Sequence, residues 1–264
     1  MKKLVIVLIV TLTISSCKKK AEPTTPIQNV KEEISTSVDP FVNSIEVAHK
    51  KETLQKYEGI KYDISITFGG NLILDALITT SIDSRYSKIE LKNGESIYIN
   101  DDKVYVSPGL KDENSVRFSA YTWNYFFLFP YKLNDEGTKW SEYTPSKVEA
   151  SFNAKKLSFE SGIGDAPEDW YIVYSNKSTN IIEHVAYIVT YGKTKEAAEA
   201  DPHAIQYSGY KSINGVPFAH NWTFLEWNPK ESLTNVIGHA ELNTIKFVDD
   251  LGELLTIPEG FVEK

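Results

Sequence analysis

Apolar and polar side chains alternate with a period of two residues through much of this chain, and this pattern constrains its fold more than any other feature. In residues 60–68 the apolar members are Ile60, Tyr62, Ile64, Ile66 and Phe68. Side chains alternate between the two faces of a strand, so this segment predicts a strand with one buried and one wet face. Gly69-Gly70 then predicts a tight turn, after which residues 72–80 return.

The alternation recurs along the chain and predicts an antiparallel meander. We expect further strands at residues 86–91, 96–100, 104–106, 155–159, 170–174, 181–190, 205–213, 216–227 and 236–248. Tight turns are expected at Asn93-Gly94 and Asn214-Gly215, because glycine tolerates the positive φ that two-residue hairpins require. Short strands joined by such turns favour one antiparallel sheet. The fold class is therefore mainly β with a few helices.

Three segments predict helices instead. Asp39 is suited to a helix N-cap with Pro40 in the first helical position, and the helix continues through Leu54. The aromatic run at residues 121–129 is too continuous for a half-exposed strand, so it predicts a short helix or a buried segment. Residues 193–200 predict a third helix.

Residues 1–17 have the pattern of an export signal. Met1-Lys2-Lys3 precedes an apolar run that ends near Thr13, too short for the roughly 20 apolar residues of a transmembrane helix. The following Ile14-Ser15-Ser16-Cys17 resembles the lipobox of bacterial lipoproteins. The resemblance implies that residues 1–16 are removed and that Cys17 carries the lipid. An ordinary secretory signal with an incidental cysteine is the alternative.

Composition divides the rest of the chain into a tether and a domain. Residues 17–40 hold the lipid-bearing Cys17 and a segment rich in Pro, Ser, Thr and charge that buries too little surface to fold. Residues 41–264 contain no second linker, and we expect a single β-rich domain. Cys17 is the only cysteine, so the chain forms no internal disulfide and its stability must come from burial.

The net charge of −8 argues against nucleic acid as a partner, because phosphate backbones are held by strongly basic surfaces. The only basic run, Lys18-Lys19-Lys20, follows Cys17 directly. It would lie against anionic lipid headgroups or form part of a solvated tether. The membrane is thus the expected partner, through the N-terminal lipid.

The sequence offers little for catalysis. It contains no Gly-x-Ser-x-Gly elbow, no Walker loop and no GxGxxG fingerprint, and we expect no catalytic residue and no cofactor. His220 and His239 lie on neighbouring predicted strands and would form a metal site with Glu226 or Glu241 if they met across the sheet. Histidines hydrogen-bonded within the sheet are the alternative, which we favour, so no metal is expected.

A second polar group lies in the acidic loop of Asp165, Glu168 and Asp169. Carboxylates of this kind are suited to calcium, although their spacing matches no EF-hand. We expect a solvated loop in which Pro167 sets a turn.

Large aromatic side chains are concentrated in a few segments and provide the candidate ligand-binding residues. These candidates are Trp123, Phe127, Phe218, His220, Trp222 and Phe224. The last four share one face of the predicted strand 216–227, which we place on the concave side of the sheet. They either line an apolar cavity between sheet and helices or fill the core of a large sheet.

Two resemblances extend these expectations. Residues 210–222, with a tyrosine, a glycine turn and a proline before a long strand, resemble a hairpin of the periplasmic lipoprotein carrier and receptor (LolA/LolB-like) superfold. The runs LNDEG at 133–137, SFESGIGDAPEDWYIVY at 158–174 and DPHAI at 201–205 resemble a family of uncharacterised lipoproteins from Bacteroidota, over roughly residues 45–250. The resemblances imply a curved antiparallel half-barrel covered by helices, and no assigned activity.

Together these observations predict a non-enzymatic cell-envelope lipoprotein, lipid-anchored in the outer membrane, that binds a lipid or other hydrophobic ligand in a half-barrel cavity. An envelope scaffold or interaction module with a filled core is the second interpretation. A metal-assisted hydrolase that uses His220 and His239 is the third. The sequence leaves the ligand, the protein partners and the oligomeric state open.

Overall fold

One antiparallel sheet of 13 strands organises the described part of the chain. We analysed a computed structural model, which describes residues 38–264 except residues 112, 114, 253 and 254. Its strands are β1 (Gly59–Phe68), β2 (Asn71–Ser81), β3 (Tyr86–Leu91), β4 (Ser96–Asn100), β5 (Lys103–Val106), β6 (Thr138–Glu142), β7 (Phe152–Phe159), β8 (Tyr171–Asn176), β9 (Ile182–Tyr187), β10 (His203–Ile213), β11 (Val216–Asn228), β12 (Ser232–Val248) and β13 (Val262–Glu263). The predicted signal peptide, Cys17 and most of the predicted tether lie outside the described residues, and the division at residue 40 stays a prediction.

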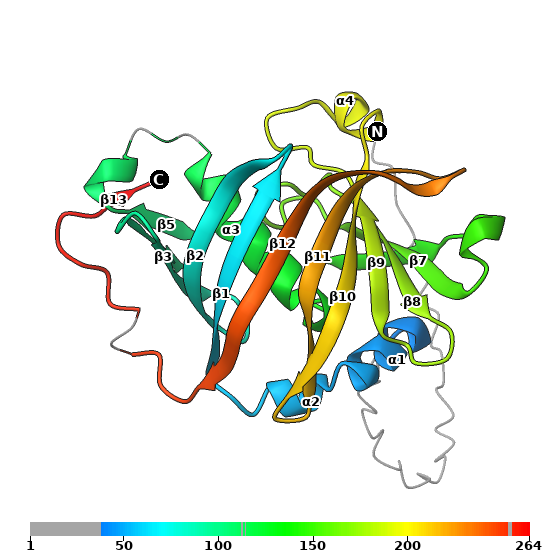
Figure 1. Cartoon of the computed structure of the whole chain (residues 1–264), viewed down its shortest axis with the longest axis horizontal. Helices are drawn as coiled ribbons and strands as arrows, with labels where there is room; N and C mark the ends of the chain where they lie inside the picture. Colours follow the sequence, from blue (N-terminus) through cyan, green and yellow to red (C-terminus); the bar gives the residue numbers. More distant parts are fainter. Residues whose placement is uncertain (1–37, 112, 114, 253–254) are drawn as a thin grey trace, which may run out of the picture. The chain divides into compact units, whose positions relative to one another are not determined.

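Almost every strand pairs with its neighbour in sequence, as a meander does. The order across the sheet is β13-β5-β4-β3-β2-β1-β12-β11-β10-β9-β8-β7-β6 (Figure 1). The exceptions include the centre, where β1 pairs with β12, with Ile60 opposite Phe247. This mainly β, antiparallel architecture confirms the predicted fold class.

The tight turns have the backbone conformation that their residues favour. Asn214 and Gly215 have φ of 50° and 87°, and Gly69 and Gly70 have φ of 54° and 80°. Two successive residues with positive φ give a turn whose twist matches that of the paired strands. The turn at Asn214-Gly215 therefore sets the register of the β10–β11 hairpin, in which Ile213 faces Val216.

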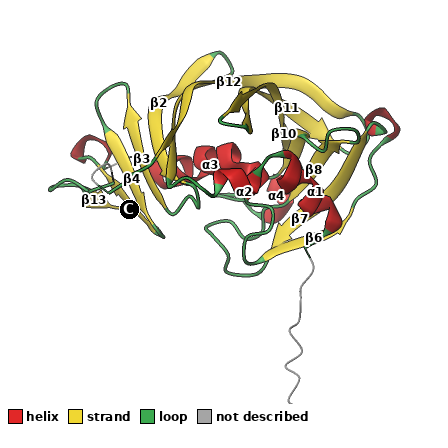
Figure 2. Ribbon diagram, turned by 90° about the horizontal axis from the view of Figure 1, so that it is seen from below, coloured by secondary structure: helices red, strands yellow, loops and turns green. Residues whose placement is uncertain are grey.

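The helices lie mainly on the concave side of the sheet. They are α1 (Pro40–Ala48), α2 (Lys51–Leu54), α3 (Val116–Leu128) and α4 (Lys195–Glu199), with short 3-10 turns η1 (Pro108–Leu110), η2 (Phe129–Tyr131) and η3 (Lys147–Glu149). Figure 2 shows α3 lying between the two arms of the curved sheet. None of the helices in the described ranges is long and apolar enough to cross a membrane.

The first predicted helix is present but divided. The Asp39 carboxylate accepts a hydrogen bond of 2.8 Å from the backbone N–H of Phe41 and caps α1 as expected. Lys50 then has φ of 60°, which breaks the helix before α2 begins. The buried His49 lies at this break, and its Nε2 accepts a hydrogen bond of 3.1 Å from the Ile182 N–H.

The core lies between the concave face of the sheet and α3. On β1 the alternating members Ile60, Tyr62, Ile64 and Ile66 are at most 1% exposed, as their period-two pattern predicts. The ring of Tyr62 stacks on that of Phe127 from α3, with the centroids 3.8 Å apart. Burial of these faces in one continuous cluster stabilises the curved sheet.

A smaller cluster covers the opposite face of β8 and its neighbours. Ile172 and Tyr174 belong to it, whereas the alternate residues Tyr171 and Val173 belong to the concave core. The η3 segment supplies Glu149, which is 2% exposed and accepts a hydrogen bond from Ser232, on the β11–β12 hairpin. The sheet is therefore packed on both faces at this arm.

The differences from the sequence predictions include two element boundaries and one strand. The aromatic helix begins at Val116, before residue 121, and β12 begins at Ser232, before residue 236. Strand β6 was not predicted, because it forms an edge of the sheet and only Trp140 among its residues is a large apolar side chain. An edge strand with one packed side chain has no alternating apolar pattern to detect.

Candidate functional site

The six candidate residues come together on the concave side of the sheet. Phe218, His220, Trp222 and Phe224 point from β11 towards α3, which contributes Trp123 and Phe127. Trp222 and Phe224 are 1% and 0% exposed, and none of the six is more than 9% exposed. The predicted common face of β11 and its concave orientation therefore agree with the structure.

These side chains pack against one another and leave little space. The rings of Phe127 and Phe218 are stacked with centroids 5.4 Å apart, and Trp123 meets Phe224 edge-on at 6.1 Å. The void beside Phe127, Phe218 and Trp222 has a volume of about 10 Å³. A void of that size holds one water molecule at most. In this conformation the six residues form a filled core, and their assignment to ligand binding stays a prediction.

The histidine pair proposed for a metal site does not form. Trp222 faces Ala240 across the β11–β12 ladder and both are buried, so this register defines the concave face. His239 faces Thr223 one position away, on the convex face, whereas His220 is concave and its Nδ1 lies 2.8 Å from the Leu242 carbonyl oxygen. Because alternate residues project to opposite faces, the two imidazoles cannot share an ion.

The acidic loop is not a calcium site in this structure. Asp165 pairs with Arg117 of α3 at 2.6 Å, and Asp169 turns inwards to accept hydrogen bonds from Thr190. No group of three or more potential ligands gathers anywhere in the described ranges. The expectation of a solvated loop is wrong for Asp169, which is only 9% exposed.

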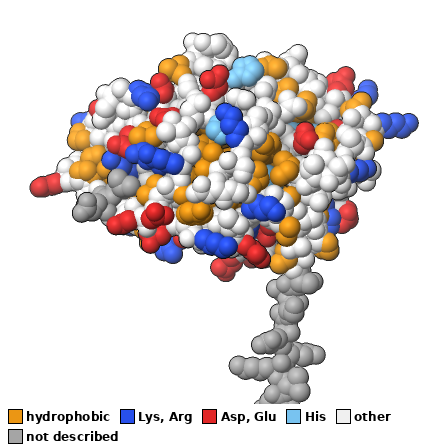
Figure 3. Space-filling model, turned by 60° about the horizontal axis from the view of Figure 1, so that its bottom comes forward, with side chains coloured by type: hydrophobic (Ala, Val, Ile, Leu, Met, Phe, Trp, Pro, Cys, Tyr) orange, Lys and Arg blue, Asp and Glu red, His pale blue; other side chains and the backbone are white. Residues whose placement is uncertain are grey.

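A large groove lies along α3, and its volume is about 1190 Å³. Phe118, Tyr121 and Tyr125 line it from α3. Ile82 lines it from the β2–β3 turn, and Ile163 lines it from the β7–β8 loop. On the molecular face drawn in Figure 3, apolar side chains are interspersed with charged ones. We refer to the space beside these five residues as the α3 groove.

One wall of the α3 groove is aromatic. Tyr125 lies against Tyr171 with the ring centroids 5.6 Å apart, and Phe159 meets Tyr171 edge-on at 6.0 Å. Phe118 stacks on Tyr191 at 4.9 Å. Several of these rings are only half-buried, so the wall offers apolar surface to a ligand.

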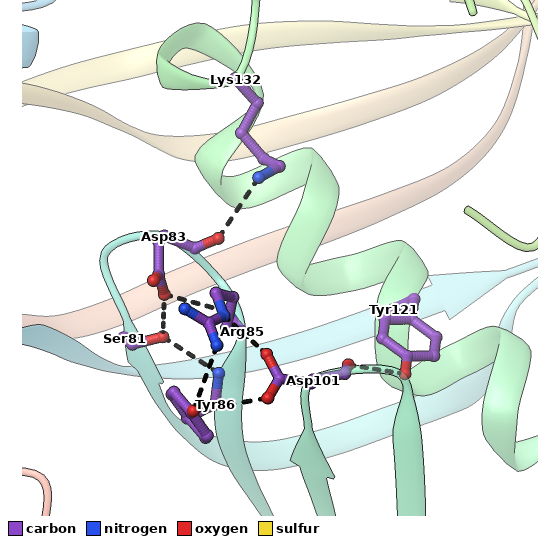
Figure 4. A network of polar contacts seen from close by, with 7 residues as sticks. All are labelled: Ser81, Asp83, Arg85, Tyr86, Asp101, Tyr121 and Lys132. Atoms are coloured by element: carbon purple, nitrogen blue, oxygen red, sulfur yellow. Dashed lines mark hydrogen bonds and ion pairs between the residues drawn. The ribbon is translucent and has the colours of Figure 1, made fainter. Parts of the chain in front are cut away.

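The opposite wall is polar and tied together by hydrogen bonds (Figure 4). Arg85 pairs with Asp101 at 2.6 Å and thereby joins the β2–β3 turn to the β4–β5 turn. The Tyr121 hydroxyl donates to the Asp101 carbonyl oxygen at 3.2 Å and joins α3 to the same turn. The hydrogen bond from Arg85 lowers the pKa of the Asp101 carboxyl, so this carboxylate remains charged.

Sequence reasoning missed most of the groove. It singled out the acidic loop and the aromatic run but assigned neither to this place. Phe118, Tyr121 and Tyr125 recur at spacings of three and four residues, which place them on one helical face. This spacing was the available signal, whereas the loops that complete the groove are brought together only by the tertiary fold.

No protein-family model matches the chain, and no curated protein sequence matches it. A LolA superfamily protein from Nitrosomonas europaea has a similar solved structure, with a TM-score of 0.55 and 9% identity, covering 82% of this chain and 97% of that one. A DUF1329 family protein from Desulfovibrio piger gives a TM-score of 0.52 at 13% identity, covering 83% and 100%. At these identities the likeness is one of fold. The described domain is thus a LolA-like curved half-barrel.

Proposed function

We propose that this chain is a non-enzymatic binding protein of the bacterial cell envelope that takes a lipid or other hydrophobic ligand in the α3 groove. The observation that carries the proposal is the groove itself, with a volume of about 1190 Å³ and an aromatic wall. Ligand sites in proteins are typically concave, largely apolar and about 300–1,000 Å³ in volume. The LolA-like fold is compatible with such a role but does not identify the ligand.

The proposal includes anchoring through Cys17, which lies outside the described residues. The lipobox-like run before Cys17 and the resemblance to Bacteroidota lipoproteins support a lipid anchor in the outer membrane. Replacing the thiol removes the site of attachment, so Cys17→Ser should move the protein from the membrane fraction to the soluble fraction. Unchanged fractionation and processing of the variant would refute the anchor.

The filled core supports a second candidate function, an envelope scaffold or interaction module. This core contains a void of only about 10 Å³, beside Phe127, Phe218 and Trp222. They would join a ligand site only if α3 moved away from β11. The two functions differ in whether the folded protein binds a hydrophobic ligand at all.

Binding is best tested with the chain from residue 17 carrying Cys17→Ser, because this protein has no lipid of its own. A solvent-sensitive fluorescent dye that brightens in apolar sites reports occupation of the groove, and lipid extracted from the purified protein is identified by mass spectrometry. Phe118→Glu places a charge on the aromatic wall and should lower dye affinity about tenfold or more, since a charge opposes transfer of an apolar ligand.

Val148→Glu is the matched control, because Val148 is 71% exposed and does not line the groove. It introduces the same charge and should leave the affinity unchanged. If neither dye nor native lipid binds, the scaffold interpretation holds. If both variants bind the dye equally well, binding occurs outside the α3 groove.

A further inference from the structure

The α3 groove has more acidic than basic side chains. Eight carboxylate side chains and four basic side chains line it. Each of the basic residues is already in an ion pair at 2.6 Å: Lys51 with Glu46, Arg85 with Asp101, Arg117 with Asp165 and Lys132 with Asp135. The cations are therefore satisfied within the protein, and the groove retains acceptors for a ligand.

Asp169 is the most enclosed of these carboxylates. It is 9% exposed, and its Oδ1 accepts hydrogen bonds from the backbone N–H of Thr190 at 2.8 Å and from the Thr190 hydroxyl at 2.7 Å. Among the described residues no basic side chain forms an ion pair with it. Burying a charge without an opposite charge nearby costs free energy, so a cationic group on a ligand would stabilise the ionised Asp169 carboxylate.

A second and independent acceptor lines the same groove. Asn124 of α3 is 2% exposed, and its Nδ2 donates to Thr80 Oγ1 at 2.9 Å and to Ser87 Oγ at 2.8 Å. Its Oδ1 is buried and has no hydrogen-bond partner in the described structure. Of the six buried side-chain N and O atoms without a partner in the described structure, it is the one whose residue lines the groove, so a ligand there is in a position to donate to it.

Aromatic rings line the groove together with the Asp169 carboxylate. Burial is the main cause of the raised pKa of Tyr125 and of Tyr171, and the charge of nearby Asp169 raises both further. The two rings are 5.6 Å apart and lie on the aromatic wall. Aromatic faces attract cations as well as apolar chains, and this attraction is strongest where water is excluded.

We propose that the α3 groove selects amphiphiles that carry an ammonium head, with the cation held at Asp169 beside Tyr125 and Tyr171 and the apolar chain along the aromatic wall. This inference rests on the proposed function and names its ligand class. An ammonium supplies both the positive charge and the hydrogen-bond donors that the groove lacks. A carboxylate or phosphate head would instead meet the negative charge of Asp169.

The test compares three probes with the same chain: dodecylammonium, dodecanol and dodecanoate. Each is titrated below its micellar concentration into the chain from residue 17 carrying Cys17→Ser, by calorimetry at neutral pH. We expect dodecylammonium to bind about tenfold more tightly than dodecanol, and dodecanoate to bind most weakly, as one charge-assisted hydrogen bond implies.

Asp169→Asn should reduce dodecylammonium affinity about tenfold while changing dodecanol affinity less than about twofold. Glu199→Gln is the matched control, because it removes the same charge from an exposed residue that does not line the groove and should leave both affinities unchanged. Equal loss in both variants would show that only the overall negative charge of the protein attracts the cation and would overturn the proposal.

The outcomes distinguish the ammonium preference from the proposed function, lipid binding in the α3 groove. Equal or tighter binding of dodecanoate overturns the ammonium preference and leaves lipid binding intact. Absence of binding by all three probes refutes the proposed function as well. A preference for dodecylammonium that Asp169→Asn abolishes supports both.

Discussion

The two faces of α3 carry similar side chains and meet different surroundings. The inner face presents Trp123 and Phe127 to β11, and the void beside Phe127 measures about 10 Å³. The outer face presents Phe118, Tyr121 and Tyr125 to a groove of about 1190 Å³. Aromatic content is therefore no guide to ligand binding by itself. What separates the faces is whether the surrounding side chains close over the rings or leave a groove beside them.

Polar groups beside α3 are only partly satisfied on both faces. Near the inner core, Tyr207 donates to the Phe126 carbonyl oxygen at 3.1 Å, and Tyr131 donates to the Pro217 carbonyl oxygen at 3.1 Å. On the outer side, Asn124 Oδ1 has no partner and Asp169 has no cation in the described structure. The inner core also holds buried atoms without a partner in the described structure, the Tyr62 hydroxyl and His220 Nε2, so an unsatisfied polar atom does not by itself distinguish a binding site from a core.

The largest expected effect is on the inner side. Trp222→Ala removes a side chain that is 1% exposed and should lower the free energy of unfolding by about 3–5 kcal/mol, through lost burial and the cavity left behind. Denaturant unfolding followed by circular dichroism measures this change. Dye affinity of the folded fraction should stay the same, because Trp222 does not line the groove.

The distinction between a filled inner face and a ligand-binding outer face would be wrong if Trp222→Ala were as stable as the wild type but no longer bound the dye. That result would mean that α3 moves away from β11 and that the six residues of the inner face line a ligand site. Phe118→Glu from the outer face then provides the reference for a change that acts on the groove alone.

The second effect concerns acid. Burial lowers the pKa of His49, beside Tyr131 and Tyr210 in the inner core, from 6.5 to about 3. The unfolded chain therefore binds a proton between these values that the folded chain does not bind. The neutral state of His49 therefore contributes to the free energy of unfolding above pH 6.5, and this contribution is lost as the pH falls towards 3. The loss of unfolding free energy amounts to about 3 kcal/mol between pH ~7.5 and pH ~4.5.

Unfolding measured across this pH range in the wild type and in His49→Gln isolates the contribution of the histidine. The variant retains an acceptor for the Ile182 N–H and should lose about 3 kcal/mol less over the same interval. Parallel pH profiles would show that His49 gains a proton without unfolding the core.

The smallest effect has the opposite sign and lies in the groove. Burial raises the pKa of Asp169, so its ionisation disfavours the folded state. The contribution from the protonated carboxyl is present below the ordinary pKa of about 3.9 and is lost as the pH rises through the raised value. Asp169→Asn should therefore be as stable as the wild type or more stable at neutral pH, with less advantage in acid.

Thermal unfolding at neutral pH and near pH 3.5 checks this sign. A loss of stability at neutral pH would mean that the Asp169 charge supports the fold, and the reason for assigning it to a ligand would then weaken. Stability that rises when ligand affinity falls is the usual relation between a functional residue and its fold.

The sequence predicted the sheet better than the site, for physical reasons. Alternation and glycine turns are local, so β1, the β10–β11 hairpin and their registers could be read from neighbouring residues. The concave placement of Trp222 followed from the same alternation. Strand β6 could not be predicted, since its edge position depends on pairing with β7 and not on its own composition.

The groove depends on contacts between distant segments. Asp165 meets Arg117 and Asp101 meets Arg85, and these pairs position loops that no local pattern brings together. Asp169 belonged to a loop expected to be solvated, yet Thr190 holds it inwards. Residue types alone therefore favoured the largest aromatic side chains, which the fold uses as core.

The pairing of β1 with β12 has a consequence for the time course of folding. The hydrogen-bonded centre of the sheet joins strands from opposite ends of the described chain, with Ile60 opposite Phe247. Contacts so remote in sequence form slowly, because closing a long loop costs conformational entropy before the contacts can stabilise the chain. Both arms of the sheet are able to form local hairpins first. The edge of β1 that pairs with β12 stays unpaired until β12 is available. A nascent or truncated chain that ends before β12 would thus expose an unpaired apolar strand, and this is the stage at which aggregation competes with folding.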